Sequence, residues 1–375
     1  MSAEDSKKRC FIKDFIATLI HAAIIPVILY HLYLYDIILF GTFKLLLLAF
    51  FIVFVIGPLV FKYSYSLQRS VIFLNYVNFP VNPNYSNPAA YGLPGVLNFD
   101  VITDDNIKLG VWYILPEEII KSSHNDVDIN TLATAKQVVL YNHGNSGNRV
   151  SPHRVELYQV LRKYFHVVAF DYRSYGDSSD VEPSEEGLVS DAKFMFKWIR
   201  NHTSSDIFVW GHSLGTAIST RLVRELEMEK IQATGLILES PFNNMREEIA
   251  RHPLATAFKN LPWFQFTVVN PMQENGFKFE NDKNIQNVNC SILILHAKDD
   301  FVVPYQLGYE LYKTALSNRQ NGQGSVQLES FDSKFSYGHK HICRAPELPR
   351  IIENFIVKAR DEFGTRNQKD FSMNV

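Results

Sequence analysis

Cysteine is scarce in this chain of 375 residues, which holds only Cys10, Cys290 and Cys343. Three widely spaced thiols fit neither the paired spacing of a zinc site nor a dense disulfide framework. A bridge between Cys290 and Cys343 is one interpretation, but we favour two buried free thiols. Cys10 precedes an apolar segment, where it could carry an acyl group.

An excess of charge of one sign is also missing, because 37 Lys and Arg oppose 39 Asp and Glu. Proteins that bind nucleic acid usually carry a basic stripe or a high isoelectric point, so the near-zero net charge argues against that class of partner. Neither a metal-ligand spacing nor a phosphate-binding loop occurs, and we therefore expect no metal, nucleotide or redox cofactor.

Long apolar runs are present, and they gather near the N-terminus. Residues 37–61 contain Lys44 as their only charge. About 20 apolar residues cross a bilayer core, so we predict a transmembrane helix there rather than a buried core helix. The uncharged run 15–35 could be a second span or an interfacial segment. No small-residue cleavage site follows it, which favours an uncleaved anchor.

The charges that flank these runs predict the orientation of the chain. Basic residues precede the apolar region more densely than they follow it, so we expect a cytoplasmic N-terminus. One span then places the rest of the chain on the luminal or outer side, whereas two spans return it to the cytosol. Three glycosylation sequons bear weakly on this choice. The flanking basic residues are Lys7, Lys8, Arg9 and Lys13 before, and Lys62 and Arg69 after; the sequons are Asn84, Asn201 and Asn289.

Beyond residue 95 the chain alternates short apolar runs with amphipathic stretches of helical length. The runs are rich in β-branched residues and nearly continuous, which is typical of parallel strands buried on both faces. Strands separated by helices predict an α/β fold with a parallel sheet between helices. The predicted strands are 137–141, 166–170, 207–210, 235–238, 291–295 and 326–331, with helices at 153–163, 183–200 and 216–230 and an antiparallel hairpin at 96–115.

These features divide the chain into five predicted parts. They are an N-terminal segment 1–36, a transmembrane helix 37–61, a connector 62–95, a catalytic domain 96–360 with a cap insertion at about 242–288, and a C-terminal tail 361–375.

The stretch FVWGHSLGTA, residues 208–217, matches the pattern G-x-S-x-G around Ser213. This pattern forms the sharp strand-to-helix turn that exposes a nucleophilic serine. The match alone is weak, but it lies after a predicted strand and before a predicted helix, as such a turn must. A hydroxyl also needs a base within hydrogen-bond reach.

Two further groups of residues supply what the serine needs. The loop LYNHGNSGNR, residues 140–149, follows a neighbouring strand, and the backbone N–H groups of Asn145 and Leu214 could together form an oxyanion hole. An acid and a histidine follow in the chain order Ser, Asp, His. Spacing alone leaves two candidates for each, Asp299 or Asp300 and His339 or His341.

Two sets of side chains are candidates for binding the substrate. The insertion holds seven aromatic residues, and we expect Trp263, Phe264 and Phe266 to line an apolar substrate channel, with ordinary core filling as the alternative. Three arginines lie near the loops that form the site and could face an anionic group, but we expect them to be solvated surface charges. They are Arg149, Arg154 and Arg173.

Over residues 73–352 these motifs resemble the α/β-hydrolase superfamily, and within it the membrane-anchored abhydrolase-domain lipases that act on lysophosphatidylserine and monoacylglycerol. The resemblance is carried by VVLYNHGNSGNR, HVVAFDYRSYGDS, WGHSLGT, LILESPFNNMREE, LILHAKDDFVVPYQLG and GHKHI. It implies that Asp300 is the acid, that His339 is the base, and that the protein is integral to the endoplasmic reticulum membrane with a luminal catalytic domain.

The resemblance implies a serine hydrolase that cleaves the acyl ester of single-chain glycerolipids at the membrane. A protein palmitoyl thioesterase is the alternative, since related hydrolases cleave thioesters with the same residues, usually at the cytosolic face. A hydrolase-like receptor or scaffold would need an incomplete triad, and Ser213, Asp300 and His339 are all present.

Overall fold

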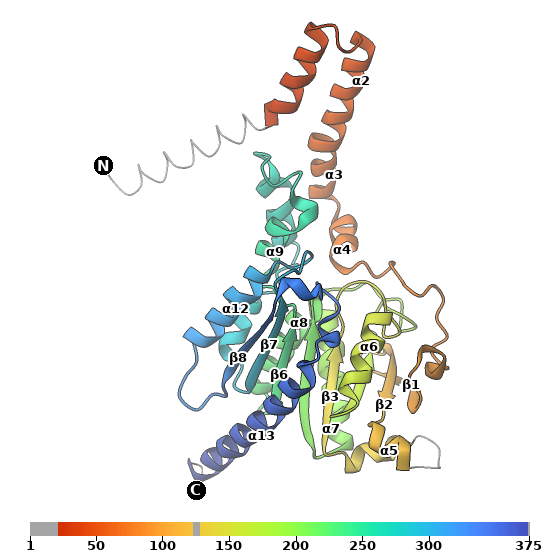
Figure 1. The fold of residues 1–375 in the computed structure, drawn as a ribbon, viewed down its shortest axis with the longest axis vertical. Coiled ribbons are helices and arrows are strands. Elements are labelled where there is room, and N and C mark those ends of the chain that lie inside the picture. Colours follow the sequence, from red (N-terminus) through yellow and green to blue (C-terminus); the bar gives the residue numbers. More distant parts are fainter. Residues whose placement is uncertain (1–21, 123–127, 374–375) are drawn as a thin grey trace, which may run out of the picture. The chain divides into compact units, whose positions relative to one another are not determined.

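A computed structural model of the chain describes residues 22–122 and 128–373. These residues form two units, each built from two stretches of sequence (Figure 1). The first unit combines the N-terminal residues to Val71 with Ile249–Phe277, and the second comprises Ile72–Glu248 with Lys278–Val375.

The first unit contains the one described helix that is long and apolar enough to cross a membrane, Phe40–Tyr63. It runs as α2 (Phe40–Phe51), a π-helical turn (Ile52–Ile56) and α3 (Gly57–Tyr63). Its position agrees with the segment predicted at 37–61. Of the earlier apolar run, the described part forms a shorter helix, Ala22–Leu34, while residues 15–21 lie outside the described part of the chain.

The second stretch of the first unit, residues 249–277, packs around a small core of its own. Ala255, Phe264 and Val269 are buried there. The stretch begins within α9 (Met245–Arg251), contains a π-helical turn (Gln265–Val269) and ends beyond α10 (Asn270–Glu274). We call residues 249–277 the inserted segment.

The second unit is built on an eight-stranded sheet in the order β1-β2-β4-β3-β5-β6-β7-β8. The β1–β2 and β2–β4 pairs are antiparallel, and every other pair is parallel. All six predicted strands are present, with ends within two residues of those expected. The strands are β1 Val96–Ile102, β2 Lys108–Ile114, β3 Gln137–Asn142, β4 His166–Phe170, β5 Asp206–His212, β6 Gly235–Glu239, β7 Ser291–Ala297 and β8 Val326–Phe331.

Helices cover both faces of this sheet, as the alternating pattern predicted (Figure 1). The helix α7 shows why these segments are helical: the Ser184 side chain accepts the Gly187 N–H, acidic residues occupy the first turn and basic residues the last. The helices of this unit are α5 Glu117–Ser122, α6 Pro152–Leu161, α7 Glu185–His202, α8 Leu214–Met228, α11 Asn281–Asn284, α12 Tyr305–Ser317 and α13 Leu348–Met373, with most of α4 Tyr65–Phe73 in the first unit.

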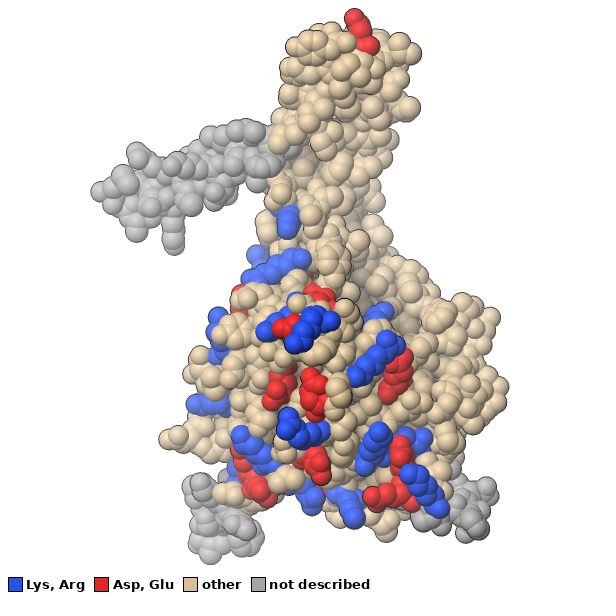
Figure 2. Space-filling model, in the orientation of Figure 1, with Lys and Arg blue, Asp and Glu red and all other residues tan. Residues whose placement is uncertain are grey.

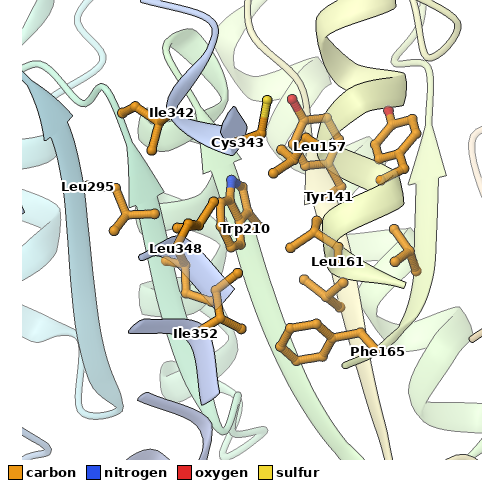
Figure 3. Packing of buried hydrophobic residues seen from close by; sticks show 14 of the residues in the cluster. Tyr141, Leu157, Leu161, Phe165, Trp210, Leu295, Ile342, Cys343, Leu348 and Ile352 are labelled. Atoms are coloured by element: carbon orange, nitrogen blue, oxygen red, sulfur yellow. The ribbon is translucent and has the colours of Figure 1, made fainter. Parts of the chain in front are cut away.

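The core on one face of the sheet lies beneath α6 and α13. Figure 3 shows Trp210 of β5 between Leu161 of α6 and Leu348 and Ile352 of α13. These side chains are fully buried. This packing holds β5, and therefore the residues that follow it, against rigid neighbours on either side.

The two cysteines within the described residues are both buried and free. Burial raises the pKa of the Cys290 and Cys343 thiols to about 12, so both stay protonated. The interpretation as two buried free thiols is confirmed, and Cys10 lies outside the described residues.

The order in which strands are added to the sheet reverses between β3 and β5, although these two strands are parallel. Strand β3 pairs with β4 on one side and with β5 on the other, so the loops after β3 and β5 leave the sheet next to each other. In open α/β sheets ligands bind at such a switch point, outside the carboxyl ends of the strands. The loop after β3 contains Asn145, and the turn after β5 contains Ser213.

Candidate active site

Ser213 occupies a strained turn between β5 and α8. Its backbone has φ 53° and ψ −120°, a region that costs a non-glycine residue about 1–3 kcal/mol. Its N–H donates to the Glu239 carbonyl at 2.9 Å, and its own carbonyl accepts the Thr216 hydroxyl at 2.6 Å. These bonds hold the predicted elbow in place, and Ser213 itself is 7% exposed.

The two glycines of the motif are required by close packing around this turn. A Cβ at Gly215 would lie 2.1 Å from the carbonyl oxygen of Asn142, and one at Gly211 would lie 2.4 Å from the carbonyl oxygen of Gly215. Because backbone atoms cannot move aside, only glycine fits at either position.

Asp300 and His339 meet at the carboxyl edge of the sheet. His339 Nδ1 lies 2.7 Å from Asp300 Oδ2, and Asp300 Oδ1 accepts the N–H groups of Val302 and Val303 at 2.9 Å each. Burial alone would raise the pKa of Asp300. Hydrogen bonds and charge from His296 and His339 outweigh burial and hold it well below its ordinary value. Asp300 is therefore a carboxylate at neutral pH.

The other two candidates make different contacts. Asp299 Oδ2 accepts the N–H of Gly338, and so fixes the loop that carries His339. The N–H of His341 donates to the carbonyl of Tyr337. Between the two acids and the two histidines, the structure joins Asp300 with His339.

His212 links the His339 loop to the elbow. Its Nε2 lies 2.8 Å from the backbone carbonyl of His339, and the two rings are 4.9 Å apart. A carbonyl only accepts, so Nε2 carries the proton. Burial and the adjacent His339 lower the pKa of His212 well below its ordinary value, which keeps it a neutral donor. No sequence pattern points to this role, because His212 occupies the variable position of the motif before the serine.

His296 was missed for a different reason, since it reads as a buried residue of β7. Its Nε2 lies 3.0 Å from the Val303 carbonyl and 3.4 Å from Asp300 Oδ2. Asp300 therefore faces an imidazole on two sides. Its position four residues before Asp300 becomes informative only once Asp300 is known to be the acid.

The loop after β3 lies against the nucleophile. A Cβ at Gly144 would be 3.0 Å from the Cβ of Ser213. The Ser146 N–H donates to the Phe73 carbonyl and anchors the loop. Within residues 22–122 and 128–373, no hydrogen bond engages the backbone N–H of Asn145 or Leu214, and the oxyanion hole expected from them stays a prediction.

The expectation that the three arginines are solvated surface charges is wrong. Arg149 is paired with Asp171 and Asp177, and Arg173 with Asp191 and Asp105. Arg154 donates instead to the carbonyls of Asn148, Gly144 and Ser146, at 2.7, 3.2 and 2.8 Å. Arg149, Arg154 and Arg173 are 0%, 2% and 9% exposed. Burial is tolerated because each guanidinium has several acceptors.

Replacing Arg154 by Ala is expected to lower kcat about 100-fold with little change in KM. Three carbonyls of the Gly144–Asn148 loop would lose their donor, and misplacing one oxyanion donor costs on the order of 10²–10³ in kcat. Steady-state kinetics below the melting temperature measure this. Arg162→Ala is the matched control, because Arg162, which caps the C-terminus of α6, is also buried and bound to carbonyls, those of Leu115 and Pro94. A similar kcat loss in both variants contradicts the role assigned to Arg154.

Glu239 is a buried acid beside the elbow that no sequence motif points to. It ends β6, and its Oε2 accepts the Trp210 indole N–H at 2.9 Å. Burial raises its pKa to about 7; the Trp210 bond opposes this, and the charge of Asp300 adds to it. Near neutral pH this carboxyl is therefore only partly ionised.

Replacing Glu239 by Gln is expected to flatten the pH dependence of stability. Because the folded-state pKa lies above the ordinary 4.5, the unfolded chain loses this proton first as the pH rises, and stability falls between pH 4.5 and about 7. The ionised form costs about 3 kcal/mol above that range, which the amide avoids. Denaturant unfolding at pH 5 and pH 8 measures the difference, and equal pH slopes in both proteins contradict it.

The three predicted substrate-binding aromatics belong to the first unit. The Trp263 indole N–H donates to the Phe54 carbonyl at 2.7 Å, and Phe264 is buried with Ala255 and Val269. Phe266 is 56% exposed. Their binding of an acyl chain stays a prediction.

A strained serine elbow at the carboxyl end of a central strand, linked through His212 to the loop of an Asp–His pair, defines an α/β hydrolase. An alpha/beta hydrolase fold profile matches residues 137–279. Solved structures of an esterase from Pyrococcus furiosus, Pf2001, and of an α/β hydrolase from Vibrio vulnificus share the fold, with TM-scores of 0.54 and 0.56. They are 20% and 19% identical, covering 75% and 81% of this chain and 97% and 94% of their own.

Curated relatives are more similar in sequence. Lysophosphatidylserine lipase ABHD12 of Macaca fascicularis is 40% identical over 310 residues, 81% of this chain and 78% of its own. The Gallus gallus protein of the same name is 39% identical, covering 81% of each chain, and human protein ABHD12B is 30% identical over 77% of this chain and 80% of its own. The chain belongs to the ABHD12 family of α/β hydrolases.

Proposed function

We propose that this chain is a membrane-anchored serine hydrolase that cleaves the acyl ester of lysophospholipids, lysophosphatidylserine among them, and of monoacylglycerols. The observation that carries the proposal is the 2.7 Å contact between His339 and Asp300, tied through His212 to the elbow that holds Ser213. The substrate class is supported by the names of the relatives that are about 40% identical.

In the proposed mechanism, Ser213 Oγ attacks the ester carbonyl while His339 Nε2 takes its proton. Asp300 accepts from Nδ1–H, which holds the imidazole in the tautomer with a free Nε2 and stabilises the imidazolium. The oxyanion accepts the N–H groups of Asn145 and Leu214. The C–O bond of the ester then breaks, and the departing alcohol, glycerol or glycerophosphoserine, takes the proton from His339. Water repeats the sequence on the acyl-enzyme and releases the fatty acid.

A competitive lipid panel tests the substrate class. The full chain and its Ser213→Ala variant, both in detergent-solubilised membranes, receive lysophosphatidylserine, lysophosphatidylcholine, monoacylglycerol, diacylated phospholipid and a palmitoylated peptide thioester. We expect fatty acid release from the single-chain esters by the parent protein only. Preferential cleavage of the thioester would replace the lipase proposal by the palmitoyl thioesterase alternative.

The proposal includes one span across the endoplasmic reticulum membrane, a cytoplasmic N-terminus and a luminal catalytic unit. The helix Phe40–Tyr63 supports the span, and the denser basic residues before it support the orientation.

Glycosylation is expected at Asn84 and Asn201 but not at Asn289. The first two asparagines are exposed, whereas Asn289 is half-buried, with its amide donating to Glu227 and accepting from Gln323. Removing Asn84 and Asn201 by Asn→Gln changes should abolish the glycosidase-dependent gel shift, and Asn289→Gln should leave it unchanged. A chain insensitive to the glycosidase and cut by protease outside intact microsomes contradicts a luminal catalytic unit.

A further inference from the structure

The inserted segment is bound to the long helix Phe40–Tyr63 by polar as well as apolar contacts. The Trp263 indole donates to the Phe54 carbonyl, in the middle of the π-helical turn, and Phe258 packs on the Phe54 ring at 5.3 Å. Lys62 Nζ lies 3.0 Å from the ring centre of Phe266. Residues some 200 positions apart in the chain thus form one body.

These contacts fix the level of the inserted segment along the helix. A bilayer core takes about 20 residues, so a span that begins at Phe40 ends near Leu59. Phe54 then lies roughly 8 Å inside the core edge, and Lys62 lies outside it. At the C-terminal end of the inserted segment, the Asn275 amide donates to Gln68, and Phe277 stacks on Tyr65. The inserted segment therefore extends from the polar side of the core edge, at the level of Tyr65 and Gln68, to the level of Phe54 inside the core.

The composition of the inserted segment suits that position. Between His252 and Gln273 the only charged side chain is Lys259. Leu254 is 76% exposed and Phe266 56% exposed, although the segment has a folded core. In the view of Figure 2 the visible surface of α2 is likewise uncharged, whereas the surface of the second unit carries interspersed acidic and basic residues. Trp is the residue that membrane interfaces favour.

We propose that the inserted segment is a second membrane-contacting element, seated at the boundary between head groups and acyl chains beside the transmembrane helix. Leu254 contacts acyl chains, Phe266 lies at the head-group level beside Lys62, and Lys259 reaches back to the lipid phosphates. The Phe54 carbonyl satisfies the indole N–H of Trp263, so the ring sits among acyl chains with its polar atom paired. This inference rests on the membrane anchoring included in the proposed function.

Quenching by labelled lipid tests the proposal on the purified full chain. In a Cys10→Ser background, single changes Leu254→Cys, Leu46→Cys and Met228→Cys receive an environment-sensitive fluorophore, and each protein is placed in phosphatidylcholine nanodiscs. Part of the lipid carries a nitroxide high on its acyl chain. Met228 is the matched control, because it is 73% exposed and lies on α8 of the second unit. Leu46 reports on the anchor itself.

We expect the nitroxide lipid to quench the labels at 46 and 254 at least twofold, and the label at 228 to respond only to aqueous iodide. A quenched label at 46 with an iodide-accessible, lipid-insensitive label at 254 overturns the inference and leaves the anchor intact; the apolar surface would then await a protein partner. Lipid-insensitive labels at both 46 and 254 overturn the proposed anchoring and the inference together.

A kinetic experiment adds a second readout. Leu254→Asp is expected to raise the apparent KM for monoacylglycerol in vesicles about tenfold and to leave kcat for a soluble short-chain nitrophenyl ester unchanged. Met228→Asp should change neither value. An unchanged vesicle KM in the Leu254 variant, in a protein whose melting temperature is also unchanged, speaks against contact with the lipid surface.

Discussion

Ester hydrolysis is expected to fall at least 10⁴-fold when Ser213 is replaced by Ala, with the melting temperature almost unchanged. The hydroxyl is the only group removed, and it lies in the turn that packs against the Gly144 loop. Loss of the nucleophile in a serine hydrolase leaves only the contribution of the oxyanion hole and of binding. The measurements are fatty acid release and covalent labelling by a fluorophosphonate, both of which the variant should lack.

Ser240 supplies a matched control for this variant. Like Ser213 it is buried, follows a parallel strand and has a positive φ, here 51°. Its Oγ makes no hydrogen bond with the described residues. Ser240→Ala should retain activity within about twofold. Persistent fluorophosphonate labelling of the Ser213 variant would mean that another residue is the nucleophile.

The second large effect is expected for Asp300→Asn, a fall in kcat of about 10⁴-fold at neutral pH. An amide at this position can present its NH₂ group to His339 Nδ1, which favours the tautomer whose Nε2 carries a proton and cannot act as a base. Fluorophosphonate labelling should slow by a similar factor without disappearing, because the Ser213 hydroxyl is still present.

Asp299→Asn tests the same chemistry one residue away. Asp299 accepts the Gly338 N–H through one oxygen, and an amide oxygen can still accept that bond. We expect its kcat to stay within about tenfold of the parent. Comparable losses in both variants would mean that the loop geometry, and not a specific Asp300–His339 pair, limits catalysis.

The parallel strands could be predicted closely because burial on both faces leaves a direct mark in the sequence. Runs such as His166–Phe170 contain no polar position that faces solvent, and their ends are marked by turn residues. The elbow could be predicted equally well. Two glycines and a serine at this spacing, between a strand and a helix, indicate a turn too tight for a Cβ at either glycine.

The burial of the arginines and the pairing of one acid with one histidine could not be predicted in the same way. Arg154 is buried against carbonyl groups, and a sequence carries no sign of which carbonyls a guanidinium will meet. Asp299 and Asp300 differ by one position in a loop, so only the folded backbone decides which faces His339. Residue types therefore indicated the chemistry, whereas long-range packing determined which acid and which histidine pair.

The make-up of the first unit has a consequence for how the protein is synthesised. Its two stretches, ending at Val71 and starting at Ile249, are separated by about 180 residues, which a ribosome takes roughly 10–35 s to translate. Throughout that interval the helix Phe40–Tyr63 has been made but Trp263 has not. The Phe54 carbonyl therefore lacks its indole donor until strands β1 to β6 have been translated. The first unit can therefore be completed only after most of the second unit has been translated.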